Sequence, residues 1–169
     1  MTTFTRLRFS ILALGAALVL GGPAVAQQGS EARVLKLNHT DTPSGARHLA
    51  AELFAKRVEE LTRGKYRVLV FHSGQLGNDP QSIKAVAEGK LDFTASATGS
   101  FAGLVPELNL TALPYLVDGY EQGWRFYDNS PWLHTQFDKM AAKGVRHMAT
   151  WEAGFRSFTT RSPMTQPAD

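Results

Sequence analysis

Strand-like and helix-like segments alternate along the chain, and this order restricts the fold more than any other feature of the sequence. Runs rich in β-branched and other apolar residues cover 33–39, 66–71 and 91–95. Between them lie two segments, at about 45–61 and 79–88, whose apolar residues recur at helical spacing. Strands that alternate with helices pair in parallel through right-handed crossovers. The sequence therefore predicts an α/β fold built on a parallel sheet.

Residues typical of helix ends mark the limits of these two helices. Ser44 or Gly45 opens the first helix, and Gly64 follows its last turn. Asp79 comes directly before Pro80, and this pair favours a helix start because proline fits the first turn. A carboxylate at that position accepts hydrogen bonds from free backbone amides. We therefore expect Asp79 to cap the second helix.

The rest of the chain predicts further elements of both kinds. They are helices at about 121–127 and 132–143 and strands at 145–151 and 155–160. The sequence has no internal repeat and no low-complexity linker between them. We expect a first α/β lobe over residues 27–150, followed by a crossover strand and the start of a second lobe over 151–169.

The end of the sequence is rich in loop-forming residues. Pro163 and Pro167 lie in a short polar stretch that ends at Asp169. An aspartate in this place suits the N-cap of a further helix. We therefore expect the 169-residue chain to be the N-terminal part of a longer protein.

The first 26 residues have the organisation of a secretory signal peptide. Arg6 and Arg8 precede an apolar run over 11–20, and the segment ends in Ala24-Val25-Ala26. The apolar run is shorter than the roughly 20 residues that span a bilayer. We expect cleavage after Ala26 and export to the periplasm.

Charge and cysteine content argue against several classes of protein. The formal net charge of +3 falls to +1 without residues 1–26, because Arg6 and Arg8 are the charged residues of that segment. A nearly neutral protein lacks the basic surface of a nucleic-acid binder. The sequence contains no cysteine, so no disulfide stabilises the fold in an oxidising compartment. We expect a monomer, held together by its hydrophobic core, that has no nucleic-acid partner.

Polar side chains follow each of the three predicted parallel strands. In open parallel sheets, ligands bind beyond the carboxyl ends of the strands. The candidate ligand-binding residues at these ends are His39 and Thr40, then Ser73 and Gln75, then Ser96 and Thr98. Such groups suit a small polar solute that is held by hydrogen bonds. The alternative is that Ser, Thr and Gly occur there because turns favour them.

A second candidate region begins at Trp151. Strand alternation places Arg156 on the face opposite Phe155, and Gly154 leaves room for close approach. A guanidinium group can bind a carboxylate through two parallel hydrogen bonds, so Arg156 is a candidate ligand contact. The alternatives are an exposed arginine or one paired with Glu152. Trp151 is either a stacking surface for the ligand or a core residue.

Sequence signals for catalysis are weak. The chain has no G-x-S-x-G elbow, no P-loop, no G-x-G-x-x-G and no cysteine nucleophile. His39 and His72 would lie at the ends of neighbouring strands, which leaves open an exported hydrolase or metalloenzyme. Neither histidine has a second ligand at metal-like spacing. We therefore expect no catalytic residue, no metal and no cofactor.

Several short segments, taken in order, resemble one known family. They are Ala51-Glu52-Leu53-Phe54-Ala55 with Val58-Glu59, the stretch 71–79, the stretch 88–94, Val105-Pro106-Glu107 with Leu113-Pro114-Tyr115-Leu116, and Trp151-Glu152-Ala153-Gly154-Phe155-Arg156. In this order they resemble the solute-binding subunits of TRAP (tripartite ATP-independent periplasmic) transporters. The resemblance extends from Leu35 to the end of the chain.

The resemblance implies a periplasmic binding protein-like clamshell of type II, of which this chain holds the first lobe and the start of the crossover. Such a protein closes on a small organic acid and delivers it to the membrane subunits of a TRAP permease. Arg156 matches an arginine that often contacts the ligand carboxylate in this family. The family's principal carboxylate-binding arginine would lie just past Asp169. Ala97 and Thr98 leave no charged side chain for a substrate amine, which favours a simple acid over an amino sugar.

Cleavage after Ala26 predicts that the exported protein begins at Gln27. Intact-mass measurement of protein recovered from the periplasm tests this directly. Ala26→Asp should accumulate as the precursor, because signal peptidase requires small residues before the cut. Periplasmic protein that still carries Met1, or that begins elsewhere, would contradict the prediction.

Overall fold

The computed structural model describes residues 31–156, 159–164 and 166. The chain divides into two compact units, Met1–Ser30 and Glu31–Asp169, and all the described residues belong to the second. The predicted signal peptide therefore lies outside the described residues. Within the described part of the chain, no helix has the length and apolar character needed to cross a membrane.

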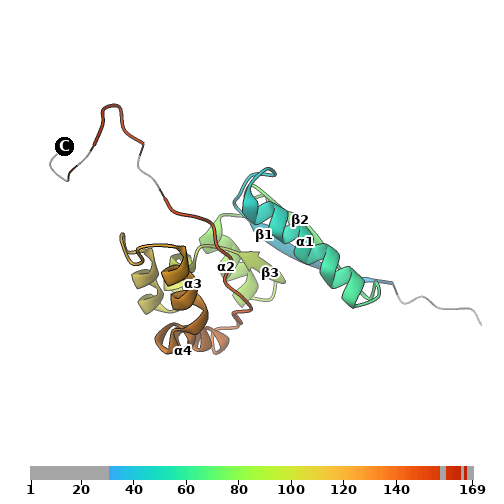
Figure 1. Cartoon of the computed structure of the whole chain (residues 1–169). Helices are drawn as coiled ribbons and strands as arrows, with labels where there is room; N and C mark the ends of the chain where they lie inside the picture. The colour runs from blue at the N-terminus through green and yellow to red at the C-terminus, as the bar shows by residue number, and fades with distance from the viewer. Residues whose placement is uncertain (1–30, 157–158, 165, 167–169) are drawn as a thin grey trace, which may run out of the picture. The chain divides into compact units, whose positions relative to one another are not determined.

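The order of elements is that of an α/β protein (Figure 1). The strands and helices are β1 (Arg33–His39), α1 (Ala46–Leu61), β2 (Tyr66–Phe71), α2 (Asp79–Ala87), β3 (Phe93–Ala95), the 3-10 helices η1 (Thr98–Gly103) and η2 (Pro106–Ala112), α3 (Tyr120–Asn129) and α4 (Pro131–Ala141). The predicted strands at 33–39 and 66–71 are confirmed with their limits unchanged. The two helices predicted between 121 and 143 are also confirmed, with ends shifted by a few residues.

The sheet is parallel throughout and places β1 in the centre, in the order β2-β1-β3. Leu37 pairs with Val70 on one side and with Phe93 on the other. This arrangement confirms the predicted parallel α/β fold. Because all three strands point the same way, the residues that follow them gather at one edge of the sheet. We call this the strand-end edge.

β3 begins two residues later than predicted, at Phe93 instead of Leu91. The cause is the side chain of Asp92, which accepts a hydrogen bond from a backbone amide of β1. The amide of Lys36 donates to Asp92 Oδ2 at 2.8 Å. That amide is therefore unavailable for a strand bond, and Leu91 packs into the interior at 4% exposure.

The start of α2 corrects the prediction for Asp79. The N-cap is Asn78, whose side chain accepts from the amide of Gln81 at 3.0 Å while Gln81 Oε1 accepts from the amide of Asn78 at 2.9 Å. This reciprocal pair satisfies two free amides and is a capping box. Asp79 is the first residue of the helix, so its carboxylate is free for other partners. The end of α1 is as predicted, with Gly64 at φ 75° and its amide bonded to the carbonyl of Glu59 at 2.8 Å.

Two hydrophobic clusters support the fold. One lies between α1 and the sheet, where α1 runs along the strands (Figure 1), and its buried members are Leu37, Ala51, Ala55 and Val68. The other joins the 3-10 helices to α4, and its buried members are Val105, Leu108, Leu133, Phe137, Met140 and Val145. Val86 and Ala87 pack against the second cluster, so α2 links it to the sheet.

The strands predicted at 145–151 and 155–160 are absent from the described residues. A strand exists only when its backbone pairs with a neighbour. The segment instead contacts helices through side chains: the Trp151 ring lies 6.4 Å from that of Phe54, and the Phe155 ring lies 4.9 Å from that of Tyr120. Residues 157 and 158 lie outside the described part. The division into a first lobe over 27–150 and a second over 151–169 stays a prediction.

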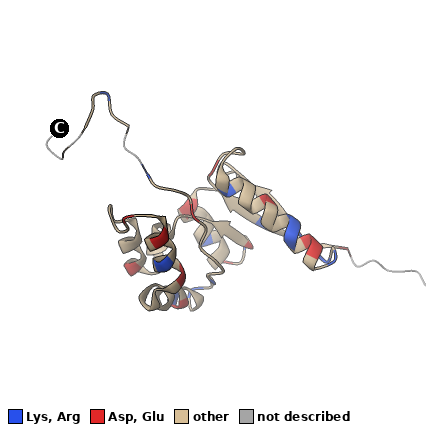
Figure 2. Ribbon diagram, viewed as in Figure 1, with Lys and Arg blue, Asp and Glu red and all other residues tan. Residues whose placement is uncertain are grey.

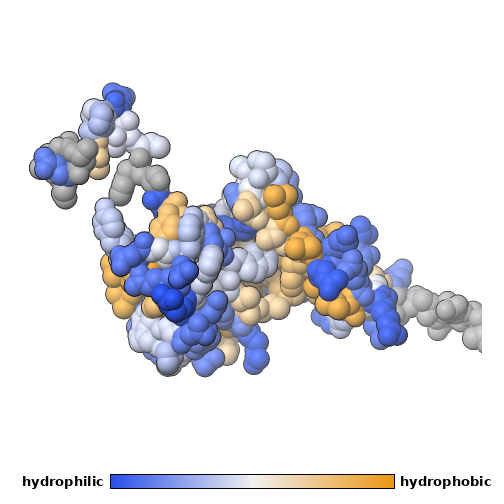
Figure 3. All heavy atoms as spheres, viewed as in Figure 1, coloured by the Kyte–Doolittle hydropathy of each residue, from blue (hydrophilic) through white to orange (hydrophobic). Residues whose placement is uncertain are grey.

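The surface is mixed in charge and locally apolar. Basic and acidic residues are interspersed along the helices in the view of Figure 2. Hydrophobic surface gathers over part of α1 (Figure 3), where Leu49 and Leu53 are each 61% exposed. The charge pattern agrees with the low net charge of the sequence.

Gly144 offers a test of the packing between α4 and α2. It has φ 81°, and a Cβ there would lie 2.7 Å from the carbonyl oxygen of Ala87. Gly89 has a similar φ of 70°, but a Cβ there meets nothing within 4 Å. We expect Gly144→Ala to lower the free energy of unfolding by about 2–4 kcal/mol and Gly89→Ala by about 1 kcal/mol. Urea unfolding followed by tryptophan fluorescence measures both, and equal losses would show that the Ala87 contact is unimportant.

Candidate functional site

A buried amide fixes the loop between β2 and α2 against the end of β1. Asn38 is fully buried, and its Nδ2 donates to the Gly77 carbonyl at 2.9 Å and to Ser82 Oγ at 2.6 Å. Its Oδ1 accepts from the amide of Leu76 at 3.1 Å. Each side of the amide therefore has a partner, as a buried polar group requires. The loop after β2 is thereby held in one position beside β1.

Backbone bonds extend the contact between the first two strands beyond their ends. The amide of Ser73 donates to the carbonyl of Asp41 at 2.8 Å, and that of Gly74 donates to the carbonyl of His39 at 2.9 Å. Ser73 has φ 51°, in the left-handed region that favours glycine. Non-glycine residues in this region carry strain of about 1–3 kcal/mol and cluster at functional sites.

Asp79 joins the first and third loops of the strand-end edge. Its Oδ1 accepts from Thr40 Oγ1 at 3.0 Å. Its Oδ2 accepts from the amide of Ala97 at 3.4 Å and from Ser100 Oγ at 3.5 Å. The carboxylate that the sequence suggested as a helix cap therefore holds the β1 and β3 loops together.

Arg47 lies in the first turn of α1 and spans the same two loops. Its Nη1 donates to Thr40 Oγ1 at 3.3 Å and to the carbonyl of Ala95 at 3.4 Å. Sequence reasoning missed this residue because it belongs to a helix and not to a strand-end loop. A signal was nevertheless present. The residues three and four positions after Arg47 are alanines, so the helix offers it no acid of its own, whereas Lys56 and Arg57 both reach Glu60.

Three histidines lie close together behind this edge. His39 is fully buried, and its ring lies 5.3 Å from that of His48, which in turn lies 5.4 Å from that of His72. His39 is the last residue of β1 and His72 directly follows β2, so both lie at the ends of neighbouring strands as predicted. His48 was not predicted, because it comes from the first turns of α1.

Hydrogen bonds define a neutral form of His39. The amide of Asp41 donates to His39 Nδ1 at 3.1 Å, so this nitrogen carries no proton. The proton is then on Nε2, which lies 3.1 Å from His48 Nδ1 and donates to it. Burial lowers the pKa of His39, and the nearby His48 and Arg47 lower it further. Protonation at Nδ1 would break the bond to Asp41.

The remaining strand-end candidates differ in their surroundings. Ser73 and Gln75 are exposed, and Ser73 Oγ lies 3.0 Å from His72 Nδ1. Ser96 is half-buried, with its Oγ 2.8 Å from Thr94 Oγ1. Thr98 is half-buried beside Tyr127; burial raises the pKa of that tyrosine, and hydrogen bonds with Thr111 and Thr98 oppose the rise. The structure thus brings Thr40 into the network of Asp79 and Arg47, and leaves Gln75 at the surface.

Among the described residues, the second candidate region makes no hydrogen bond, ion pair or ring contact with the strand-end loops. Arg156 is exposed, and it makes no hydrogen bond or ion pair with the residues that the structure describes. Glu152, the alternative partner for Arg156, instead accepts from Trp124 Nε1 at 3.1 Å. Trp151 is 40% exposed, and its ring is tilted by 58° to that of Phe54. Ligand contacts of Arg156 and Trp151 therefore stay predictions.

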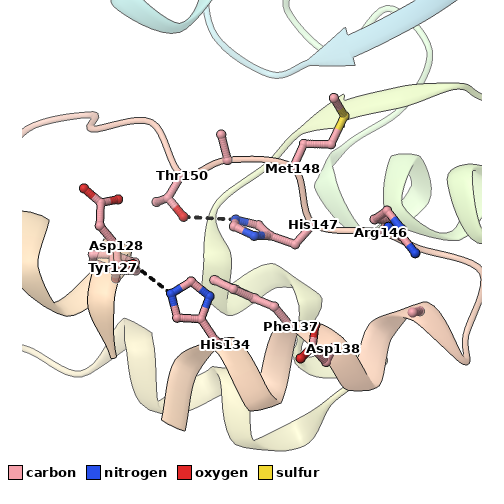
Figure 4. A pocket seen from close by; sticks show the side chains of 11 residues that line it. Tyr127, Asp128, His134, Phe137, Asp138, Arg146, His147, Met148 and Thr150 are labelled. Atoms are coloured by element: carbon pink, nitrogen blue, oxygen red, sulfur yellow. Dashed lines mark hydrogen bonds between the residues drawn. The ribbon is translucent and has the colours of Figure 1, made fainter. Parts of the chain in front are cut away.

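A separate cavity of about 500 Å³ lies between α4 and the segment that follows it (Figure 4). His147 stacks on Phe137 with ring centres 3.8 Å apart, and its Nε2 lies 3.1 Å from Thr150 Oγ1. The other labelled residues are Tyr127, Asp128, His134, Asp138, Arg146 and Met148. None of the candidate ligand-binding residues lines this cavity. It is therefore distinct from the strand-end edge.

The chemistry of the strand-end edge suits binding. It presents hydroxyls, one guanidinium and one carboxylate that is already bonded to three partners. Among the described residues, no group of three or more His, Cys, Asp and Glu side chains could hold a metal ion. A parallel α/β lobe with such an edge belongs to the class of ligand-binding lobes.

Comparison with known proteins identifies the family within this class. Residues 37–169 match the family model described as bacterial extracellular solute-binding protein, family 7. The chain belongs to this family, whose members include the solute-binding proteins of TRAP transporters.

Relatives and solved structures agree with this assignment. The 2,3-diketo-L-gulonate-binding periplasmic protein of Escherichia coli is 28% identical over 91% of this chain and 47% of its own length. The TRAP solute-binding protein of Sulfurospirillum deleyianum with bound succinate is 32% identical at a TM-score of 0.67, covering 73% of this chain and 39% of that one. The sugar acid binding protein of Advenella mimigardefordensis in complex with galactonate is 30% identical at a TM-score of 0.69, covering 74% of this chain and 40% of that one. The chain thus spans about half the length or less of these proteins.

The neutral state of His39 predicts how stability depends on pH. The unfolded chain binds a proton on this histidine at about pH 6.5, whereas the folded chain resists it. Stability from this group is therefore complete above about pH 6.5 and decreases as the pH falls toward the folded pKa, by up to about 1.4 kcal/mol per pH unit.

Unfolding by urea between pH 7.5 and 5 measures this slope. His39→Gln, which keeps an acceptor for Asp41, should flatten it. Burial also lowers the pKa of His147, so this residue makes stability depend on pH in the same direction. His147→Gln is therefore the matched control, and it should leave the contribution of His39 to the pH dependence unchanged. A slope unchanged by His39→Gln would contradict the prediction.

Proposed function

We propose that this chain forms the first ligand-binding lobe of a periplasmic solute-binding protein that captures a carboxylate-bearing small molecule and delivers it to the membrane subunits of a TRAP-type permease. The observation that carries the proposal is the family match over residues 37–169, on a fold whose strand-end edge gathers polar groups from three loops. Export through the predicted signal peptide would place the protein where such a permease takes up its solute.

The ligands of related structures support an organic acid. Succinate and galactonate, the molecules bound in the two solved structures, each carry a carboxylate. The curated relative from Escherichia coli is named for another sugar acid.

Arg156 is the proposed carboxylate contact in this chain. Its guanidinium is exposed and has no acid partner among the described residues, so its donors are available. A charge-assisted pair of hydrogen bonds to a carboxylate contributes about 1.5–3 kcal/mol. Hydroxyls of the strand-end loops would bind the remainder of the ligand. Closure of two lobes around the ligand would then be the state that the permease recognises.

The proposal includes no catalysis, cofactor or nucleic-acid partner, and it assumes a monomer. An exported hydrolase or metalloenzyme that uses His39 and His72 is the alternative. The environment of His39 opposes it, because the ring is fully buried and both its nitrogens are engaged. A catalytic or metal-binding histidine needs one nitrogen free for substrate or metal.

A thermal-shift screen of the full-length protein that the gene encodes tests the proposed function. Mono-, di- and keto-carboxylates are tested against the wild type, Arg156→Ala and Arg161→Ala, the last being a matched exposed arginine. An acid that binds the folded state at 100 times its Kd stabilises it by about 2.7 kcal/mol. We expect one acid to raise the melting temperature of the wild type and of Arg161→Ala, with Arg156→Ala binding about 10- to 100-fold more weakly. If no acid shifts the wild type while stoichiometric zinc co-purifies, the transport function is wrong.

A further inference from the structure

Arg47 occupies a position that the proposed function does not yet explain. The residue is half-buried at the start of α1, with its Nη1 bonded at 3.3 Å to Thr40 Oγ1 and at 3.4 Å to the carbonyl of Ala95. These two partners belong to loops that follow β1 and β3. The guanidinium therefore lies at the strand-end edge, where parallel sheets bind ligands.

The guanidinium of Arg47 has no carboxylate bonded to it within the described part of the chain. It forms no ion pair there, whereas Lys56 and Arg57 of the same helix both reach Glu60, at 4.0 and 2.6 Å. It is also the one Lys or Arg in the stretches 39–48, 71–79 and 95–100 of the sequence. A partly desolvated guanidinium without a directly bonded counterion attracts an anion.

The nearby carboxylates are occupied in ways that leave the guanidinium unpaired. Asp79 accepts from Thr40, Ala97 and Ser100. Asp41 accepts from the backbone amides of Thr42 at 3.0 Å and of Arg47 at 3.3 Å, so it holds the start of α1 and not the guanidinium. The described residues accept from Nη1 alone, which leaves Nε and Nη2 available to a ligand.

Neighbouring polar groups complete a small binding surface. Ser96 is half-buried directly after β3, and Thr40 lies between Arg47 and Asp79. The Thr40 hydroxyl donates to Asp79 and accepts from Arg47, so it orients the guanidinium and leaves the ligand oxygens to Nε and Nη2 of Arg47. His39 lies behind this surface with its Nε2 3.1 Å from His48 Nδ1, so neither of these ring nitrogens faces the ligand.

We propose that Arg47 is a specificity-determining residue that binds a second anionic group of the ligand, so that the protein prefers molecules with two acid groups. This inference rests on the proposed function, in which a separate arginine binds the first carboxylate. A ligand with a single acid group would leave one guanidinium without a counterion. Arg47 would thereby discriminate between two ligands of the same shape that differ in one charge.

Isothermal titration calorimetry of the full-length protein with succinate and succinamate tests the inference, because these probes differ only in one acid group. The variants are Arg47→Gln, which removes the charge, Arg47→Lys, which keeps it, and Arg57→Ala as a control on the same helix. We expect the wild type and Arg57→Ala to bind succinate at least tenfold more tightly than succinamate. Arg47→Gln should lose most of this ratio by weakening succinate binding, and Arg47→Lys should keep part of it.

Several outcomes would overturn the inference. They are equal binding of the two probes by the wild type, an equal loss of both in Arg47→Gln, and binding of galactonate but not of succinate. In the last case the proposed function stands and the role of Arg47 fails. Failure of the wild type to bind any acid would instead reject both. Melting temperatures of the unliganded variants separate a loss of binding from a loss of folding.

Discussion

The geometry of the strand-end edge depends on the buried side-chain amide of Asn38. This amide sits on the central strand and bonds to the backbone of Leu76 and Gly77 and to Ser82 of α2. Leaving a buried amide group unpaired costs about 1–3 kcal/mol, so the loop after β2 has to return to β1. That return places the first turn of α2, and with it Asp79, beside the loops that follow β1 and β3. One core interaction therefore positions a surface network.

The parts of the fold that local chemistry decides could be predicted from the sequence. β1 follows from alternating apolar residues, and β2 follows from a run of β-branched and aromatic residues. Gly64 ends α1 because its positive φ suits glycine. Elements whose limits depend on which of several groups binds a backbone amide, or on a pairing strand, could not be predicted. Asp92 takes the amide of Lys36 and shortens β3, Asn78 displaces Asp79 as the cap, and residues 145–151 lack a strand partner although their composition favours a strand.

The residues of the candidate site likewise include some that could be predicted from the sequence and some that could not. Thr40 and Ser96 could be located at the sheet edge because residues after parallel strands always gather there. Arg47 and His48 reach that edge from α1, and their arrival depends on how the helix packs against β1 through Ala51 and Ala55. Small residues at these positions let the helix axis come close to the sheet. No motif in the sequence predicts the distance between the helix axis and the sheet. The lack of an acidic residue one turn after Arg47 does indicate that α1 provides no ion-pair partner for it.

The histidines and Arg47 connect the stability of the lobe to its charge. His39 stays neutral because it is buried and because His48 and Arg47 oppose a second positive charge nearby. An anion bound to Arg47 would reduce that opposition and raise the pKa of His39. Protonation would nevertheless break the bond from the amide of Asp41, and the carboxylate of Asp41 holds the amide of Arg47 itself. Protonation of His39 would therefore strengthen the attraction for an anion and loosen the loop that presents Arg47, so the two effects oppose each other.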